Sequence, residues 1–233
     1  MTLARVAACE PLGPYLQVRI ERTFPAGEPG QFHMLRALAH DGFLARPLSA
    51  VASDDASVTF LCQPRGPALA ALAVVGAEVE VLGPFGRGFD VAAAGRSPLL
   101  VGGGFGAALL APLSRRLPAA ALLAAFRDAD AARAAELVPA DEREIALPPV
   151  KVLELLEPRL ARASCVLAAG PDGLVRAVAA ACATAGVPCQ VALEAPMACG
   201  YGACYGCAVR LGDRLVRLCV EGPVVAGARV AAA

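Results

Sequence analysis

Four cysteines near the C-terminus constrain this chain more than any other feature. They follow the spacing C-x4-C-x2-C-x11-C and are Cys199, Cys204, Cys207 and Cys219. This spacing is that of the four thiolate ligands in plant-type [2Fe–2S] centres. The glycines between them allow the backbone to wrap tightly around ligand sulfurs. The sequence therefore favours a [2Fe–2S] cluster in the last forty or so residues.

Two other interpretations of the cysteine cluster stay open at this point. Four thiolates also suit a tetrahedral zinc ion, but zinc ribbons pair two C-x2-C knuckles, and only Cys204 and Cys207 have that spacing. Four structural cysteines without a metal would leave the clustering unexplained. The five remaining cysteines stand alone in apolar surroundings, and an odd total of nine argues against a disulfide framework. These five, expected in the core, are Cys9, Cys62, Cys165, Cys182 and Cys189.

Composition excludes several classes of protein. The 21 basic residues balance 21 acidic ones, which gives no electrostatic reason to expect a nucleic-acid partner. A hydrophobic content of 57% excludes disorder. The longest apolar stretch, 98–113, is interrupted by glycine and proline, whereas a membrane-spanning helix needs about 20 apolar residues. The segment before Cys9 is similar to a lipoprotein signal but has no apolar region. We expect a cytoplasmic protein with no membrane contact.

Hydrophobic patterning divides the 233 residues into two domains and a tail. Alternating strands predict an antiparallel β-barrel over residues 1–95, with one helix near 68–75. Apolar runs that alternate with helical segments predict a parallel α/β domain over 96–193. The tail, 194–233, carries the four clustered cysteines. The expected strands cover 15–22, 57–62, 78–82, 97–101, 122–126, 164–168 and 188–193, and the expected later helices cover 107–117, 128–138, 150–160 and 172–185.

The cysteine segment resembles the C-terminus of the electron-transfer subunit of class B dihydroorotate dehydrogenase. The resemblance rests on Glu194–Cys207 followed by Leu218–Val224, and it continues upstream along nearly the whole chain. It implies a ferredoxin-reductase-like fold in which an FAD-binding β-barrel precedes a nicotinamide-nucleotide domain. The further matching segments, in the family's order, are Pro29–Phe32, Arg46–Ser49, Gly83–Phe89, Gly102–Gly106 and Ala111–Leu113.

The resemblance also implies an FAD site in the barrel. The matching tetrapeptide is Arg46, Pro47, Leu48 and Ser49. An arginine can form charge-assisted bonds to the pyrophosphate. On residues alone an edge strand is the better interpretation of this tetrapeptide, and the resemblance is what favours a flavin site. The strand Thr59, Phe60 and Leu61 is expected to lie along the flavin. At a second segment, where the family has Gly-Thr at a helix start, this chain has Gly66 and Pro67, so one hydroxyl is lost.

A third expected site is for a nicotinamide nucleotide. The glycines Gly102, Gly103, Gly104 and Gly106 follow an apolar strand, as in turns that hold a pyrophosphate at a helix N-terminus. Tight strand-to-helix packing without a ligand is the alternative. The family's Cys-Gly-Pro is replaced by Ala169-Gly170-Pro171, and the 126–150 segment is short. These departures weaken the expectation for NAD more than those for FAD and the cluster.

The function implied by the resemblance is electron transfer in pyrimidine (UMP) biosynthesis. Electrons would pass from the FMN of a dihydroorotate dehydrogenase catalytic subunit through [2Fe–2S] and FAD to NAD⁺, and two copies of each chain would form a heterotetramer. A reductase subunit of a hydrogenase or of an NADPH–ferredoxin transhydrogenase is an alternative, and a zinc-stabilised nucleotide-binding protein is another. We identify no catalytic side chain, because His33 and His40 are the only histidines. His33 is expected to be a half-exposed strand residue.

Overall fold

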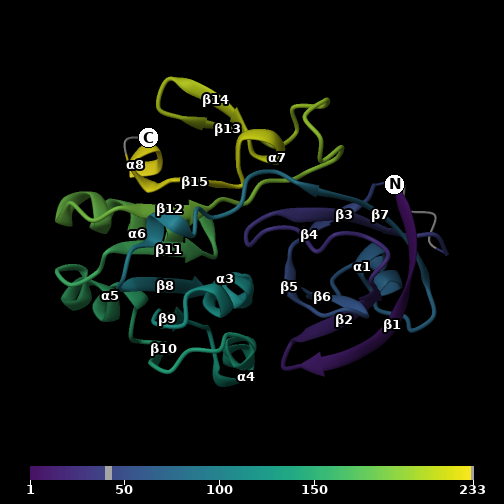
Figure 1. Ribbon diagram of the computed structural model, residues 1–233, viewed down its shortest axis with the longest axis horizontal. Coiled ribbons are helices and arrows are strands. Elements are labelled where there is room, and N and C mark those ends of the chain that lie inside the picture. Colours follow the sequence, from purple (N-terminus) through teal and green to yellow (C-terminus); the bar gives the residue numbers. More distant parts are fainter. Residues whose placement is uncertain (40–43, 232–233) are drawn as a thin grey trace.

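A seven-stranded antiparallel sheet, wrapped around one apolar core, forms the first half of the chain. The computed structural model describes residues 1–39 and 44–231 (Figure 1). The strand order is β4-β3-β7-β1-β2-β6-β5, and the fully buried Phe60 and Ile20 lie in the core. The strands are β1 Thr2–Leu12, β2 Tyr15–Glu21, β3 Phe32–Ala37, β4 Arg46–Leu48, β5 Ala50–Ser53, β6 Ser57–Cys62 and β7 Glu78–Phe85. The prediction of an antiparallel β domain is confirmed.

One helix interrupts the barrel strands. It is α1, Pro67–Leu72, and it begins one residue earlier and ends three residues earlier than expected. Leu72 fills the barrel core, whereas Val74 and Val75 are exposed and Gly76 turns the chain with a φ of 82°. The helix ends there because Val74 and Val75, the next apolar residues, have no core to bury against.

A six-stranded sheet forms the second half, in the order β10-β9-β8-β11-β12-β15. Five strands are parallel, as predicted, and β15 joins antiparallel to β12. Every residue of β8 and β11 is buried, which accounts for their unbroken apolar sequences. The strands are β8 Pro98–Gly103, β9 Ala121–Ala125, β10 Arg143–Ala146, β11 Cys165–Ala169, β12 Cys189–Ala192 and β15 Val224–Ala226.

Helices cover both faces of this sheet (Figure 1). On one face α5 and α6 share a core with alternate strand residues such as Leu99 and Val101. On the other face Leu100 packs with α2, α3 and residues from the barrel wall, which joins the two domains. The helices are α2 Phe105–Ala108, α3 Ala111–Arg116, α4 Ala129–Ala132, α5 Val152–Leu160 and α6 Asp172–Ala185, with 3-10 turns at Ala92–Ala94 and Arg133–Leu137. The helices expected over 107–117 and 128–138 are thus each divided in two.

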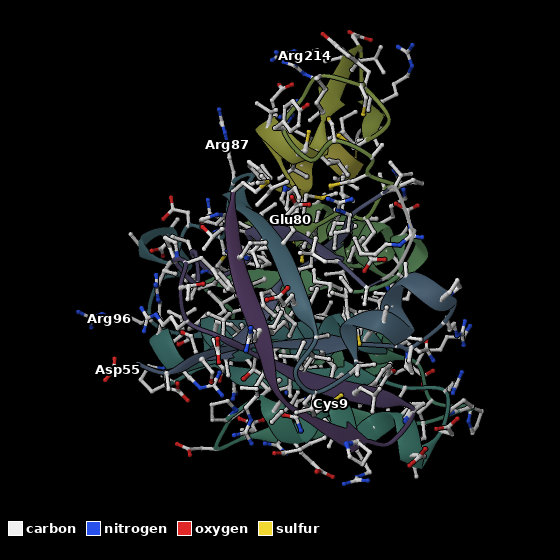
Figure 2. The ribbon with its side chains drawn as sticks, turned by 90° about the vertical axis from the view of Figure 1, so that its right-hand side faces the viewer. Cys9, Asp55, Glu80, Arg87, Arg96 and Arg214 are labelled. Atoms are coloured by element: carbon white, nitrogen blue, oxygen red, sulfur yellow. The ribbon has the colours of Figure 1, made fainter. Side chains whose placement is uncertain are left out.

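The C-terminal segment first leaves the sheet and then returns to it. The hairpin of β13 Ala208–Leu211 and β14 Arg214–Arg217 projects away from both domains, and Figure 2 shows Arg214 at its outer end. The helix α7, Leu218–Glu221, then leads to β15, and α8, Gly227–Ala231, packs against α6. The division of the chain at residues 95 and 193 stays a prediction.

Among the residues that the structure describes, no helix is both long enough and apolar enough to cross a membrane.

Candidate cofactor sites

The four clustered cysteines approach one another in two pairs. Cys207 and Cys219 are buried, and their Sγ atoms are 3.2 Å apart. The backbone N–H of Cys219 points at the Cys207 sulfur, with an N–Sγ distance of 3.5 Å. Burial first and the neighbouring Cys207 second raise the pKa of the Cys219 thiol to about 12. Without a metal this thiol therefore keeps its proton, which a bound metal ion would displace.

The second pair, Cys199 and Cys204, lies in the glycine-rich loop nearer the surface. Partial burial works to raise the pKa of Cys199, but hydrogen bonds from the Cys204 and Tyr201 amides and from the Cys204 side chain lower it to about 6. Cys204 is exposed, and its sulfur accepts the Gly206 N–H at 3.4 Å. Amide groups directed at sulfur favour the thiolate form that a metal ligand needs.

The donor set fits an iron–sulfur cluster in its chemistry. Within 1–39 and 44–231, no group of three or more His, Cys, Asp or Glu side chains is arranged to hold a single metal ion. The pairing of Cys199 with Cys204 and of Cys207 with Cys219 matches instead what two irons, each with two thiolate ligands, require.

Arg217 fastens the cysteine loop to the hairpin. Its guanidinium donates to the Gly202 carbonyl at 2.9 Å and lies 4.9 Å from the centre of the Tyr205 ring. Tyr205 has a φ of 57°, a left-handed conformation that few residues other than glycine adopt. The sequence contained no spacing signal for this role of Arg217.

An apolar cavity of about 230 Å³ lies between the barrel, the parallel sheet and the cysteine segment. Met197 lines this cavity, and Cys199 follows it by two residues. The lining residues are Gly30, Phe32, Pro47, Leu48, Ser49, Phe89, Phe105, Leu109, Ala169, Gly170, Ala192, Leu193, Glu194, Ala195, Met197 and Pro223. A cavity with mostly apolar walls beside a metal-ligand loop suits a planar aromatic cofactor.

Of the residues expected to bind FAD, three line this cavity: Pro47, Leu48 and Ser49. Arg46 begins β4 and is exposed beside them. The structure places the other expected residues elsewhere.

Thr59, Phe60 and Leu61 are buried in β6 and do not line the cavity. Gly66 and Pro67 are exposed at the start of α1. Contact of these five residues with FAD stays a prediction.

The glycine run after β8 divides into two roles. Gly102 and Gly106 allow close packing, since a Cβ on Gly102 would lie 2.6 Å from Ala107 and one on Gly106 would lie 2.4 Å from Gly170. Gly103 is packed as tightly, since its added Cβ would lie 2.5 Å from the Leu174 Cδ1, but it also lines a second cavity, of about 290 Å³, together with Gly104 and Arg127. This turn therefore combines tight strand-to-helix packing with an open cavity that could hold a ligand.

The second cavity lies at the carboxyl ends of the parallel strands, where the strand order reverses between β8 and β11. Open α/β sheets bind nucleotides at this position. Phe105 lines both cavities, so a ligand in one would lie close to a ligand in the other.

Several residues depart from the sequence-based expectation. Of the five isolated cysteines expected in the core, Cys9 and Cys189 are only half-buried. The expectation of a half-exposed His33 is wrong: its side chain is fully buried between Phe24 and Phe60, because the strand directs it into the barrel core. Its Nε2 lies 2.8 Å from the Pro25 carbonyl oxygen, and no group of the described residues forms a hydrogen bond with its Nδ1. Glu194 carries no role predicted from the sequence, yet it lines the first cavity. Its position directly after the last apolar strand was the one available signal.

Comparison with known proteins places these features in a family. Residues 194–231 match the model of the iron–sulfur cluster binding domain of dihydroorotate dehydrogenase B. The dihydroorotate dehydrogenase B (NAD(+)) electron transfer subunit of Caldanaerobacter subterraneus subsp. tengcongensis is 32% identical over 209 residues, covering 84% of both chains. The chain belongs to the family of dihydroorotate dehydrogenase B electron-transfer subunits. The resemblance inferred from the sequence is confirmed.

Solved structures of two reductases have the same fold as this electron-transfer subunit. A NADH-dependent reduced ferredoxin–NADP oxidoreductase aligns with a TM-score of 0.79 and 21% identity, over 97% of this chain and 89% of that one. The ferredoxin reductase of carbazole 1,9a-dioxygenase, in its FAD apo form, aligns with a TM-score of 0.60 and 25% identity, over 79% of this chain and 61% of that one. The predicted order of β-barrel, α/β domain and cysteine-rich end is confirmed.

Proposed function

We propose that this chain carries electrons from the FMN of a dihydroorotate dehydrogenase catalytic subunit, through a [2Fe–2S] cluster and FAD, to NAD⁺ in pyrimidine biosynthesis. The observation that carries the proposal is the continuity of the cysteine loop with the apolar cavity. Met197 lines the cavity and Cys199 belongs to the cysteine loop, so two cofactors would lie within a few residues of each other.

Each site contributes a separate property. The paired thiols Cys199 and Cys204, and Cys207 and Cys219, would hold the two irons. The walls around Pro47 and Ser49 would exclude water from a flavin ring. A bound FAD exchanges single electrons with the cluster and a hydride with nicotinamide. Phe105, shared by both cavities, marks where the nicotinamide would approach.

The catalytic partner would cover the cluster side of the chain. Cys204 is exposed, and Tyr201 and Tyr205 beside it are 62% and 59% exposed. Exposed tyrosines are typical of contact surfaces, since they combine apolar area with a hydrogen-bonding group. A complex of two electron-transfer and two catalytic subunits is the assembly that we propose.

Metal and flavin analysis of the purified protein tests the cofactor part of this proposal. We expect two irons and one FAD per chain, with cluster and flavin bands in the visible spectrum. Stoichiometric zinc without iron would overturn the cluster and favour a zinc-stabilised nucleotide-binding protein. Electron transfer is tested separately by adding dihydroorotate to the chain with and without its catalytic partner. Reduction of the flavin by dihydroorotate should require that partner. Reduction by NADPH, or by hydrogen only when a hydrogenase catalytic subunit is present, would favour the alternative reductases.

A further inference from the structure

The apolar cavity contains a single ionisable side chain. Among the described residues that line it, Ser49 and Glu194 are the only ones with polar side chains, and only Glu194 can ionise. The other lining residues, contributed by β3, β4, α2, β11, β12 and the segments around Phe89 and Pro223, carry no titratable group. A charge that a bound cofactor gains or loses in this cavity would therefore affect the ionisation of one lining side chain, the Glu194 carboxyl group.

Glu194 lies where it can reach both the cavity and water. It follows β12 by two residues, at the beginning of the segment that leads to the cysteine loop. Its side chain is exposed, and no hydrogen bond or ion pair of the described residues involves its carboxylate. Neighbouring protein atoms nevertheless desolvate the group and raise its pKa, and no charged side chain contributes to that shift. A carboxyl group of this kind binds and releases protons more readily near neutral pH than an ordinary glutamate.

We propose that the Glu194 carboxyl group exchanges the proton that accompanies each electron pair through the apolar cavity. This inference rests on the proposed function, because it assumes a flavin beside Glu194. Two-electron reduction of a flavin takes up one proton. The protonated carboxyl would release that proton into the cavity and become a carboxylate, and solvent at the exposed side would return a proton to it. The electrons come from the catalytic partner through the cluster, so the step needs no further reductant.

The same carboxylate would respond to the charge that a reduced flavin brings into the cavity. A negative charge close to Glu194 disfavours its ionised form, so its pKa should rise when the flavin is reduced. Between the pKa that Glu194 has beside the oxidised flavin and the higher pKa that it has beside the reduced flavin, Glu194 would bind a proton when the flavin is reduced. In this pH range the wild type would take up as much as one proton more per reduction than a protein without Glu194. This extra proton is a property of the equilibrium and does not depend on turnover.

The decisive experiment measures the midpoint potential of the flavin against pH, with Glu194→Gln as the variant. The control is Glu157→Gln, which removes an exposed carboxylate on α5, away from the cavity. In a plot of midpoint potential against pH, we expect wild type and Glu157→Gln to show a range in which the slope is up to twofold steeper than the slope of Glu194→Gln at the same pH. We also expect electron transfer from the partner to the flavin to slow about tenfold or more in Glu194→Gln. Iron and FAD contents should be unchanged.

If wild type and Glu194→Gln both contain flavin and cluster and show the same dependence of midpoint potential on pH, the inference is overturned and the proposed function stays intact. A wild-type protein without flavin or iron would overturn the proposed function instead. If Glu194→Gln does not retain FAD, the infrared difference spectrum of the wild type on flavin reduction replaces it. A carboxylic-acid band that changes on reduction, and shifts in Glu194→Asp, supports the inference, and a spectrum without such a band contradicts it.

Discussion

Gly200 packs directly against Met34, and this contact joins the cysteine loop to the barrel. A Cβ on Gly200 would lie 2.4 Å from the Met34 Cγ, and the φ of Gly200 is 79°. Met34 is buried in β3, next to the strand residues that line the apolar cavity. The position of the cluster relative to the cavity therefore depends on the absence of one side chain.

Gly200→Ala should destabilise the chain and reduce its iron content. Crowding against Met34 costs about 1–3 kcal/mol, and a Cβ in the left-handed conformation adds about 1–2 kcal/mol. Gly212→Ala is the matched control, because Gly212 also has a positive φ, of 59°, but no atom within 4 Å of its added Cβ. Urea unfolding and iron analysis of both variants check this. Equal losses in the two would show that the Met34 contact is unimportant.

Cys204→Ser should remove the cluster while leaving the fold in place. Cys204 is exposed, so the change creates no cavity, but it deprives one iron of a thiolate ligand. Iron should fall from two per chain to near zero, with the flavin bands kept. Cys9→Ser, a change in β1 far from the loop, should keep both irons (Figure 2). A fully loaded Cys204→Ser protein would rule out Cys204 as a ligand.

Arg217→Ala should make the cluster easier to lose. The variant gives up the hydrogen bond to Gly202 and the contact with the Tyr205 ring, each worth about 0.5–1.5 kcal/mol. Iron release to a chelator should be several-fold faster than in the wild type. Arg210→Ala on β13 removes an equally positive, exposed side chain without these contacts and should leave the release rate unchanged.

Buried His33 should make the barrel less stable in mild acid. Burial lowers its folded-state pKa below the 6.5 of the unfolded chain, although the bond to Pro25 opposes this. The unfolded state then binds more protons, so stability is complete above about pH 6.5 and falls as the pH drops through that value. The slope from one group cannot exceed about 1.4 kcal/mol per pH unit. Urea unfolding of wild type and His33→Gln from pH 5 to 8 should show this component only in the wild type.

NADH should reduce the bound flavin slowly. Ala169 lines the apolar cavity at the position where the sequence resemblance implies a cysteine, so we expect one contact that would orient the nicotinamide to be missing. Small errors in the position of a hydride donor cost up to about 100-fold in rate. Anaerobic stopped-flow mixing measures this, with dithionite reduction as the reference. Ala169→Cys should be faster than the wild type, whereas Ala168→Cys, on the opposite face of the sheet, should not. Rapid reduction of the wild type at low micromolar NADH would contradict the prediction.

Local sequence determined the features that depend on spacing and period. The four cysteines lie within 21 residues of one another, and their spacing alone indicates a shared site. The β13–β14 hairpin between Cys207 and Cys219 is what brings those two sulfurs together. Alternation in β2 and unbroken apolar runs in β8 and β11 reveal which faces are buried and hence the type of each sheet. The strand β6 also alternates in sequence, but it is buried along its whole length, which only the packing around it decided.

Tertiary structure alone decided which distant residues share a site. Glu194 and Pro47 line one cavity although almost 150 residues separate them, because the barrel docks on the sheet through a common core. The side on which a strand residue is buried depends on its pairing partners, which is why His33 entered the barrel core. The strand β15 likewise returns to the edge of the parallel sheet because the N–H and C=O groups on the outer side of β12 need partners. The local sequence of β15 does not indicate this pairing.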